Sequence, residues 1–304
     1  MQANPQIAAG LPTTAGPPPG RAGHVPALGV TYQPLDPELL SAMLPHVDCI
    51  EVTPESIAEF RDGDIVLDRD VLAELRNVQR DVRIVAHGVS LSIGSHDGWQ
   101  TSYLRLLDAL MSQVSVAWHS EHLGYTRVGD QHLGTMLALP RTEQALDLVC
   151  ERVLRLKAMF GIPFLLENIV HIVPPCQDGY SPAGFLNAIT SRTGCGLLLD
   201  VYNLECDAHN HGLDISAFLS ELDGSAVREL HLACGVEHDG LLLDVHSRLT
   251  RPCTVDLARQ ALAAVATQAD IAVYEVMPEA VPGLGRDAIA AELARLRRAL
   301  VADA

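Results

Sequence analysis

Eight short apolar runs recur along the chain at a nearly constant interval, and this repetition limits the folds open to it. The runs lie at 28–32, 48–52, 82–87, 115–121, 163–168, 196–203, 227–232 and 271–276. Their mean spacing is about 35 residues, the length of a buried strand followed by a crossover helix. Eight such units predict a single closed (β/α)8 barrel, the TIM-barrel architecture of the α/β class.

The segments between these runs carry helix signals. The clearest one begins near Thr142, continues with apolar residues at helical spacing and stops before Gly161. Weaker patterns cover 37–44, 71–78, 103–113, 215–222 and 256–266, and a last helix is expected at 286–301. We therefore expect one barrel domain over residues 27–304. Residues 1–26 contain six prolines and four glycines, which predicts a disordered tail.

Charge and cysteine content narrow the class of protein. The formal net charge of −17 disfavours a nucleic-acid backbone or an anionic membrane as the partner. No apolar run approaches the roughly 18 residues that a membrane helix needs. The seven cysteines form no CxxC pair, so neither a disulfide framework nor a zinc ribbon is indicated. We expect a cytoplasmic protein with reduced thiols that binds neither nucleic acid nor a membrane.

Polar side chains close nearly all of the apolar runs. They are Glu51, His87, Glu121, Glu167, Asn168, Asp200, Asn203, His231 and Glu275. The carboxyl ends of barrel strands meet at one face, so these side chains should converge there. Carboxylates that crowd together repel one another unless cations neutralise them. The pattern therefore predicts a metal site, although a single residue of this kind is more often a cap or a satisfied polar group.

Two further stretches add possible ligands. The segment 194–212 reads GCGLLLDVYNLECDAHNHG, and oxygen and imidazole donors follow its apolar run directly; taken alone, a solvated loop with a helix N-cap also fits it. Asp244 and His246 lie two residues apart, so they point to one side of an extended segment. Imidazoles and carboxylates without thiolates suit iron, manganese or zinc, and their number favours two or more ions.

Seven ordered motifs resemble those of the multinuclear non-haem iron-dependent oxidative enzymes, also called domain of unknown function 692, which include relatives of the methanobactin-type peptide-maturation oxygenases. The motifs are HGVSLSIGS (87–95), SEHLGY (120–125), LLEN (165–168), GCGLLLDVYN (194–203), NHG (210–212), ELHLACG (229–235) and DVHS (244–247). The resemblance implies a TIM barrel with two or three iron ions, in mixed ferrous and ferric states, and dioxygen as co-substrate. It also implies oxidation of a cysteine, or another residue, in a ribosomally made precursor peptide, with a small partner protein that recognises the peptide.

The resemblance also implies a set of site residues. By motif the ligands are His87, Glu121, Asp200, His211, His231, Asp244, His246 and Glu275, with Glu167, Asn168 and Asn203 in or beside the coordination sphere. We expect catalysis to depend on Asp200, His211 and Glu275. Thr53 stands where many relatives have a histidine, which leaves the number of irons open. Two other functions stay open: a xylose-isomerase-like divalent-metal isomerase or phosphodiesterase, and a non-catalytic barrel that binds metal or peptide.

Overall fold

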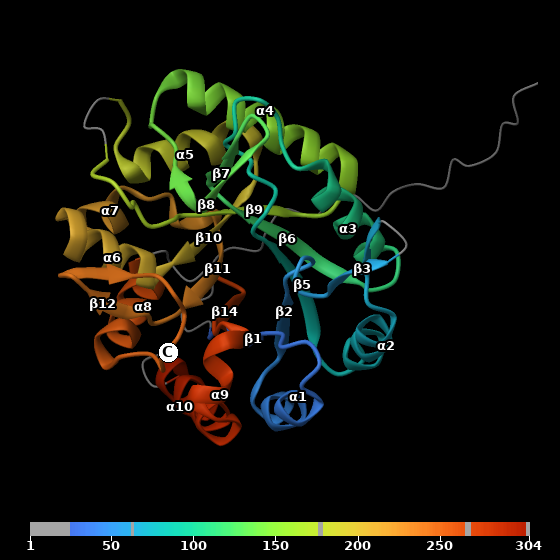
Figure 1. The fold of residues 1–304 in the computed structure, drawn as a ribbon. Helices are drawn as coiled ribbons and strands as arrows, with labels where there is room; N and C mark the ends of the chain where they lie inside the picture. The colour runs from blue at the N-terminus through green and yellow to red at the C-terminus, as the bar shows by residue number, and fades with distance from the viewer. Residues whose placement is uncertain (1–24, 62–63, 176–178, 265–268, 302–304) are drawn as a thin grey trace, which may run out of the picture.

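Eight parallel strands close into a barrel in the computed structural model, which describes residues 25–61, 64–175, 179–264 and 269–301 (Figure 1). The strands are β1 (Ala27–Thr31), β2 (Cys49–Val52), β5 (Arg83–Gly88), β6 (Val116–His122), β9 (Phe164–Glu167), β10 (Gly196–Asp200), β11 (Val227–Leu232) and β14 (Ile271–Tyr274). Strands that follow one another in this series are neighbours, and β1 closes the barrel against β14. The predicted TIM barrel is confirmed. The expected tail at 1–26 lies outside the described residues except for 25 and 26.

Helices surround the barrel (Figure 1). They are α1 (Pro37–Met43), α2 (Arg69–Val78), α3 (Thr101–Met111), α4 (Glu143–Phe160), α5 (Pro182–Thr193), α6 (Val201–His211), α7 (Ile215–Glu221), α8 (Pro252–Ala264), α9 (Val281–Leu284) and α10 (Arg286–Val301), with 3-10 turns η1 (Leu44–His46), η2 (Gly224–Ala226) and η3 (Pro278–Ala280). The expected limits of α4 are confirmed: the Thr142 side chain accepts a hydrogen bond from the Ala145 N–H, and Gly161 ends the helix at φ 66°. Within the described residues, no helix is long and apolar enough to cross a membrane.

The end of one strand agrees with its sequence signal. The apolar run placed at 196–203 is interrupted at Asp200, which was expected at the carboxyl end of the strand; β10 ends at Asp200, and α6 begins at Val201. The Asp200 carboxylate accepts a hydrogen bond from the Asn203 N–H at 2.7 Å, which is the N-cap interaction that starts a helix. Asp200 therefore closes the strand and caps the helix at once, and Asn203 lies in the first turn of that helix.

Three antiparallel hairpins were not predicted. They are β3 (Ala58–Arg61) with β4 (Asp64–Leu67), β7 (Gly124–Val128) with β8 (Gln131–Ala138), and β12 (Val236–His238) with β13 (Leu241–Leu243). Their strands are short or largely exposed, so a search for buried apolar runs does not find them. Each hairpin follows the carboxyl end of a barrel strand, namely β2, β6 or β11. They therefore extend the face of the barrel on which the polar strand ends lie.

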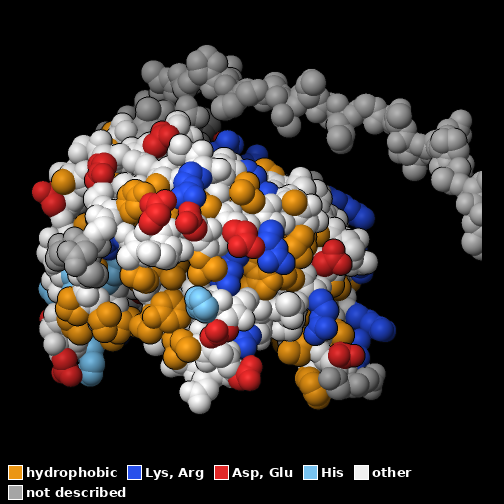
Figure 2. Space-filling view, turned by 90° about the horizontal axis from the view of Figure 1, so that it is seen from above, with side chains coloured by type: hydrophobic (Ala, Val, Ile, Leu, Met, Phe, Trp, Pro, Cys, Tyr) orange, Lys and Arg blue, Asp and Glu red, His pale blue; other side chains and the backbone are white. Residues whose placement is uncertain are grey.

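Exposed apolar side chains are concentrated on this same face. Those on loops or hairpins that follow barrel strands are Leu35, Phe60, Ile65, Val89, Val128, Ile172, Val173, Leu241, Val245 and Met277, whereas Leu154, Met159 and Val301 lie on outer helices. In the view of Figure 2, hydrophobic side chains gather across the lower half of the surface, interrupted by single charged residues. Such a surface suits contact with another chain.

An apolar layer fills the barrel interior beneath the polar strand ends. Its buried members are Cys49, Val85, Trp118, Leu165, Leu198, Ile271 and Val273, a cluster separate from the larger one under the helices. Side chains alternate along a strand, so the next inward position lies two residues further on. For six strands that position carries a polar group: Glu51, His87, Ser120, Glu167, Asp200 and Glu275. The apolar layer thus forms a floor for a polar layer at the carboxyl ends.

Gly235 allows the segment after β13 to lie against the barrel. A Cβ atom at this position would come within 1.8 Å of the Leu243 carbonyl oxygen and 3.0 Å of the Val245 nitrogen. Both of those atoms belong to the backbone, so neither can move aside as a side chain would. Only glycine fits between β11 and the segment that carries Asp244 and His246.

We predict that Gly235→Ala lowers the free energy of unfolding by about 1–3 kcal/mol, because the added methyl group overpacks a backbone contact. The control is Gly283→Ala on α9, where a Cβ atom meets nothing within 4 Å and φ is not positive. Urea unfolding of both variants and the unsubstituted protein measures the effect. Equal unfolding midpoints for Gly235→Ala and the control would contradict this account.

Candidate metal centre

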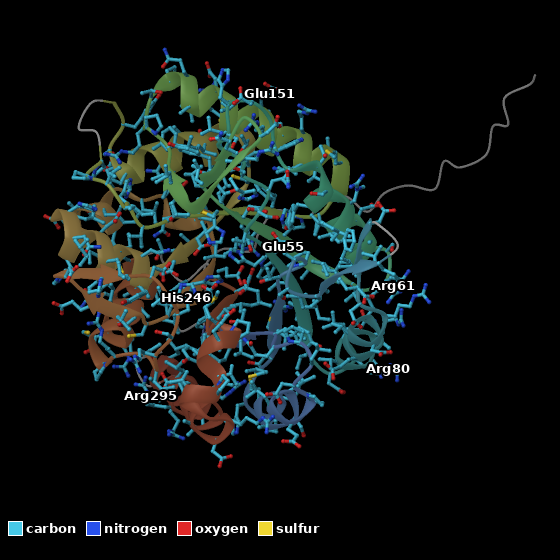
Figure 3. All side chains as sticks on the ribbon, viewed as in Figure 1. Glu55, Arg61, Arg80, Glu151, His246 and Arg295 are labelled. Atoms are coloured by element: carbon cyan, nitrogen blue, oxygen red, sulfur yellow. The ribbon has the colours of Figure 1, made fainter. Side chains whose placement is uncertain are left out.

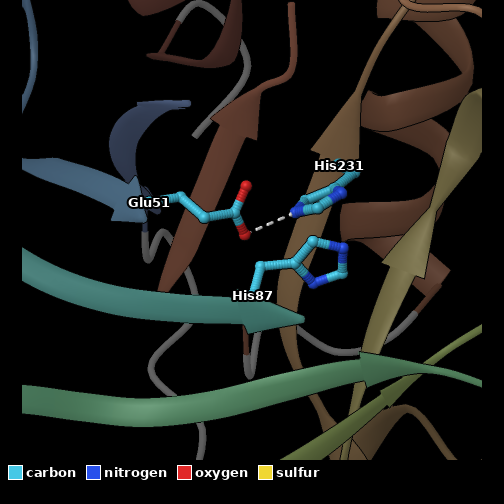
Figure 4. Close-up of side chains that lie close together, drawn as sticks. All are labelled: Glu51, His87 and His231. Atoms are coloured by element: carbon cyan, nitrogen blue, oxygen red, sulfur yellow. Dashed lines mark hydrogen bonds and ion pairs between the residues drawn. The ribbon is translucent and has the colours of Figure 1, made fainter. Parts of the chain in front are cut away.

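Three overlapping groups of imidazoles and carboxylates lie at the carboxyl ends of the barrel strands. They are Glu51, His87 and His231; His87, His122 and Glu167; and Glu167, Asp200, His231 and Glu275. Within each group, one donor atom per residue lies within 4.8 Å of the others. Figure 4 shows the first group, in which side chains from β2, β5 and β11 point toward one another. Because His87, Glu167 and His231 each belong to two groups, the three groups form one centre.

Hydrogen bonds around His87 fix which of its ring nitrogens faces the centre. Its Nδ1 lies 2.9 Å from the Ser120 hydroxyl oxygen, and that hydroxyl donates to the Ala86 carbonyl at 3.2 Å. Since the hydroxyl hydrogen is already used, Nδ1 carries the hydrogen and donates to Ser120. Burial and the imidazoles of His122 and His231 hold the pKa of His87 well below its usual range. The ring is therefore neutral, with a lone pair on Nε2.

His122 is oriented in the same way. Its Nδ1 lies 2.9 Å from the Gly88 carbonyl oxygen, which can only accept, so Nδ1 carries the hydrogen when the ring is neutral. Nε2 of His122 and Nε2 of His87 each lie 3.3 Å from the same atom, Oε2 of Glu167. Two lone pairs and a carboxylate oxygen repel one another unless a positive charge lies among them. A divalent cation satisfies all three atoms, so these residues fit a metal ion.

His231 stands between carboxylates on both sides. Its Nε2 lies 3.0 Å from Glu51 Oε2, and its Nδ1 lies 2.9 Å from Glu275 Oε2 and 3.5 Å from Glu167 Oε1. Burial alone would lower the pKa of His231, but Glu51 and Glu275 outweigh burial and raise that pKa well above its usual range. Burial raises the pKa of Asp200, and the charges of Asp244 and Glu167 raise it further. Without a cation, these groups hold protons.

Asp244 and His246 meet the centre from the loop after β13. His246 Nε2 pairs with the Asp244 carboxylate, and its Nδ1 lies 3.2 Å from Glu275 Oε1. His246 has a φ of 40°, a conformation that non-glycine residues rarely adopt, and the Met277 N–H bonds to its carbonyl at 3.0 Å. Figure 3 shows His246 inside the ring of helices. The predicted pair therefore reaches the third group through Glu275.

The two predicted asparagines differ in what their side chains contact. Asn168 donates from Nδ2 to the Asp200 carbonyl at 3.0 Å and accepts from the Asp200 N–H at 2.9 Å. Both of its polar side-chain atoms are thus engaged, and Asn168 positions Asp200. Asn203 donates from Nδ2 to the Asn168 carbonyl at 3.0 Å, but its buried Oδ1 makes no hydrogen bond within the described part of the chain. That oxygen is available to a cation.

Four predicted ligands lie outside the three groups: Asp244 and His246 reach them through Glu275, whereas Glu121 and His211 do not. Glu121 lies on the opposite face of β6, beside Tyr103, where burial and then Glu55 raise its pKa well above the usual range. His122, the next residue, takes the position expected for Glu121. His211 ends α6, and its Nε2 lies 2.6 Å from the His171 carbonyl oxygen. The structure therefore does not bring Glu121 and His211 to the centre.

Two residues of the centre were absent from the predicted ligand set. Glu51 closes one of the apolar runs, but the predicted ligand set does not include it. His122 lies within the motif SEHLGY, from which the predicted ligand was the preceding residue, Glu121. If Trp118 faces the barrel interior, alternation along the strand makes His122 face inward. If Ala117, which also packs against the interior cluster, is taken as the inward residue, alternation makes Glu121 face inward. The sequence alone could not decide between these two counts.

We predict that His122→Ala weakens Fe(II) binding at least about tenfold, because it removes one of two imidazoles that face Glu167. The matched control is Glu121→Gln: the Glu121 carboxyl has a raised pKa, so it is protonated and the amide has nearly its shape. Metal titration of both purified variants measures the difference. Equal losses of affinity in the two variants would show that the face of β6 has been misassigned.

We predict that metal binding releases protons, so that affinity for Zn(II) rises between about pH 6 and about pH 8. The pKa values of His231 and Asp200 are raised in the metal-free protein, and both groups must lose a proton to coordinate. Titration in weak buffer with an indicator dye counts the protons. An affinity that does not change over this range would contradict the prediction.

Solved structures with the same architecture include a crystal structure titled as the IOLI protein with a binding zinc atom (TM-score 0.57, 14% identity, 91% of this chain and 98% of that one). They also include a D-psicose 3-epimerase in the presence of D-fructose (TM-score 0.56, 13% identity, 90% and 99%). At such identities the likeness shows the barrel fold alone.

Sequence relatives are closer. A UPF0276 protein of Anaeromyxobacter sp. (strain Fw109-5) is 41% identical over 175 residues, which cover 58% of this chain and 62% of that protein. One of Caulobacter vibrioides (strain NA1000 / CB15N) is 33% identical over 223 residues, 72% of this chain and 80% of that protein. The family described as RiPP precursor modification enzyme MbnB/TglH/ChrH matches residues 27–297. RiPPs are ribosomally synthesised and post-translationally modified peptides, and the chain belongs to this family of enzymes that modify their precursors.

Proposed function

We propose that this protein is a multinuclear non-haem iron enzyme that uses dioxygen to modify a cysteine, or another residue, of a ribosomally made precursor peptide. Its family supports a precursor peptide as the substrate. The observation that carries the metal centre is the contact of two imidazole lone pairs with one carboxylate oxygen, from His87 and His122 to Glu167. Imidazole and carboxylate donors without a thiolate suit iron.

The proposed ligands follow from the geometry. They are Glu51, His87, His122, Glu167, Asp200, Asn203, His231, Asp244, His246 and Glu275. Glu167 presents Oε2 to His87 and His122 and Oε1 to His231, so its two oxygens serve different groups. A carboxylate placed in this way suits two neighbouring ions, and we propose two or three ions, in the mixed ferrous and ferric states that the family resemblance implies.

Iron held there would bind a substrate thiolate and activate dioxygen for oxidation of the peptide. The chain's own residues orient the ligands. Ser120 and the Gly88 carbonyl set the tautomers of His87 and His122, and Asn168 holds the Asp200 backbone from both sides. Asp200 and Glu275 stay in the proposed catalytic set. His211 contacts the loop after β9, so we assign it a positioning role there.

The exposed apolar side chains on this face support binding of a peptide, alone or together with a small peptide-recognition protein. A cytoplasmic location is part of the proposal. The six cysteines within the described residues are free, and five of them are buried. Among these, Cys195, Cys206 and Cys234 are buried near the proposed ligands, which suits a packing role.

Co-expression with the small cysteine-containing open reading frame beside the gene tests the proposal. We expect the purified protein to contain iron and the peptide to change mass only when dioxygen is present. Glu167→Gln should lose most of the iron and more than about 100-fold in activity, because two groups share this carboxylate. The control is Glu151→Gln on the outer side of α4 (Figure 3), where the side chain is 67% exposed. It should match the unsubstituted protein.

The same experiment separates the alternatives. Full iron content with an unmodified peptide would favour a non-catalytic barrel that stores metal or binds peptide. Turnover of a ketose, an aldose or a phosphodiester with added Mn(II), without any change in peptide mass, would favour a xylose-isomerase-like isomerase or phosphodiesterase. Either outcome would overturn the proposed oxidative function.

A further inference from the structure

A mostly apolar pocket lies beside the metal centre and takes no part in the ligand set. It contains about 520 Å³ of space, open in part to solvent, between the end of β8, the loop after β9 and helices α5, α6 and α7. Its walls include Leu123, Leu139, Ile169, Phe185, Leu204 and Phe218. Walls of this apolar character are typical of sites that bind an apolar group.

One edge of the pocket carries an imidazole held by a carboxylate. Asp207 accepts hydrogen bonds at both oxygens, from the His171 N–H at 2.9 Å and from His171 Nδ1 at 2.6 Å. The guanidinium of Arg141, which can only donate, lies 3.5 Å from Nε2 of the same ring. In this arrangement Nδ1 donates to Asp207 and Nε2 faces the Arg141 donor as an acceptor, and a contact of 3.5 Å is at the limit of a hydrogen bond. A closer N–H donor can replace it.

The pocket adjoins the centre on three separate elements. Leu123 follows His122 on the chain. Asn168 follows Glu167, and Leu204 follows Asn203. Adjacent Cα atoms are about 3.8 Å apart, so the Cα atom of each of these pocket residues lies at that distance from the Cα atom of a proposed ligand. A peptide also advances about 3.3–3.6 Å per residue when extended, so the step from these ligands to the pocket residues matches the step between neighbouring residues of a bound peptide.

We propose that this pocket binds an aliphatic or aromatic side chain of the substrate peptide, at a residue flanking the modified one, and that His171 Nε2 accepts a hydrogen bond from the peptide backbone at that residue. This inference rests on the proposed function, because it takes a peptide to be the substrate. The apolar walls select the side chain, and the imidazole fixes the register of the backbone. The pocket thereby determines which residue of the peptide reaches the metal centre.

Blocked amino acids test the pocket without a known peptide. The probes are N-acetyl-leucine amide, N-acetyl-phenylalanine amide and N-acetyl-glycine amide, each added to the full-length protein as purified. Saturation-transfer NMR should show binding of the first two probes and none of the glycine probe. Ala138→Phe fills the pocket from its half-buried edge and should abolish this binding. Thr135→Phe, at an exposed position on the same strand, should retain it. His171→Ala should raise the dissociation constant about fivefold.

Equal binding of all three probes, or retained binding in Ala138→Phe, would overturn the proposal. Ile169→Trp serves as a second pocket-filling variant if Ala138→Phe does not give the thermal transition of the unsubstituted protein. Probe binding needs neither iron nor dioxygen. A failure of the pocket therefore leaves the proposed oxidative function standing, whereas a protein that binds the leucine probe but never alters a peptide would refute that function alone.

Discussion

The structure depends on the neutralisation of buried carboxylates at one end of the barrel. Glu51, Glu167, Asp200 and Glu275 are all at most 7% exposed, and the three groups that they form with histidines share members. Burying several like charges is costly unless positive charge is supplied among them. Protonated imidazole supplies part of it in the metal-free protein, because the pKa values of His231 and His246 are raised by the carboxylates around them. Metal ions would supply the rest.

The interior below the polar layer is buried and mostly apolar, which increases these electrostatic effects. Trp118 donates from Nε1 to Glu229 at 2.7 Å, and both side chains are buried. Burial and then the charge of Glu51 raise the pKa of Glu229 to about 8. Cys49 and Val85 complete this floor. With a low-dielectric floor on one side, charges at the centre are screened only from the open face. The packing of the barrel interior therefore affects how strongly the polar side chains at this end attract a cation.

The hairpins and loops decide what else reaches the centre. The segment after β13 brings Asp244 and His246 to Glu275, and the close approach at Gly235 fixes its path. The loop after β9 does two things at once: Asn168 holds Asp200, and His171 forms the edge of the apolar pocket. Proposed metal ligands and pocket walls are thus consecutive residues on the same elements.

Much of the fold could be predicted because buried strands leave a strong local signal. The apolar runs gave all eight barrel strands, and Thr142 and Gly161 gave both ends of α4. The hairpins lacked that signal, since their strands are short or exposed. Asp200 marks the end of β10 because it interrupts the apolar run, and it also caps α6.

The sequence by itself determined the number of barrel strands, the spacing of the crossover helices and the chemical identity of the donors that close the barrel strands. Only the tertiary structure decided which of two adjacent donors on β6 faces inward. The pairing of β5 with β6 shifts register between Ile84 and Ala86, whose partners are Val116 and His119. An extra residue on β6 reverses the alternation of its side chains at this bulge. Glu121 therefore turns toward the helices and His122 toward the metal centre, because a bulge depends on the neighbouring strand, which is distant in the sequence.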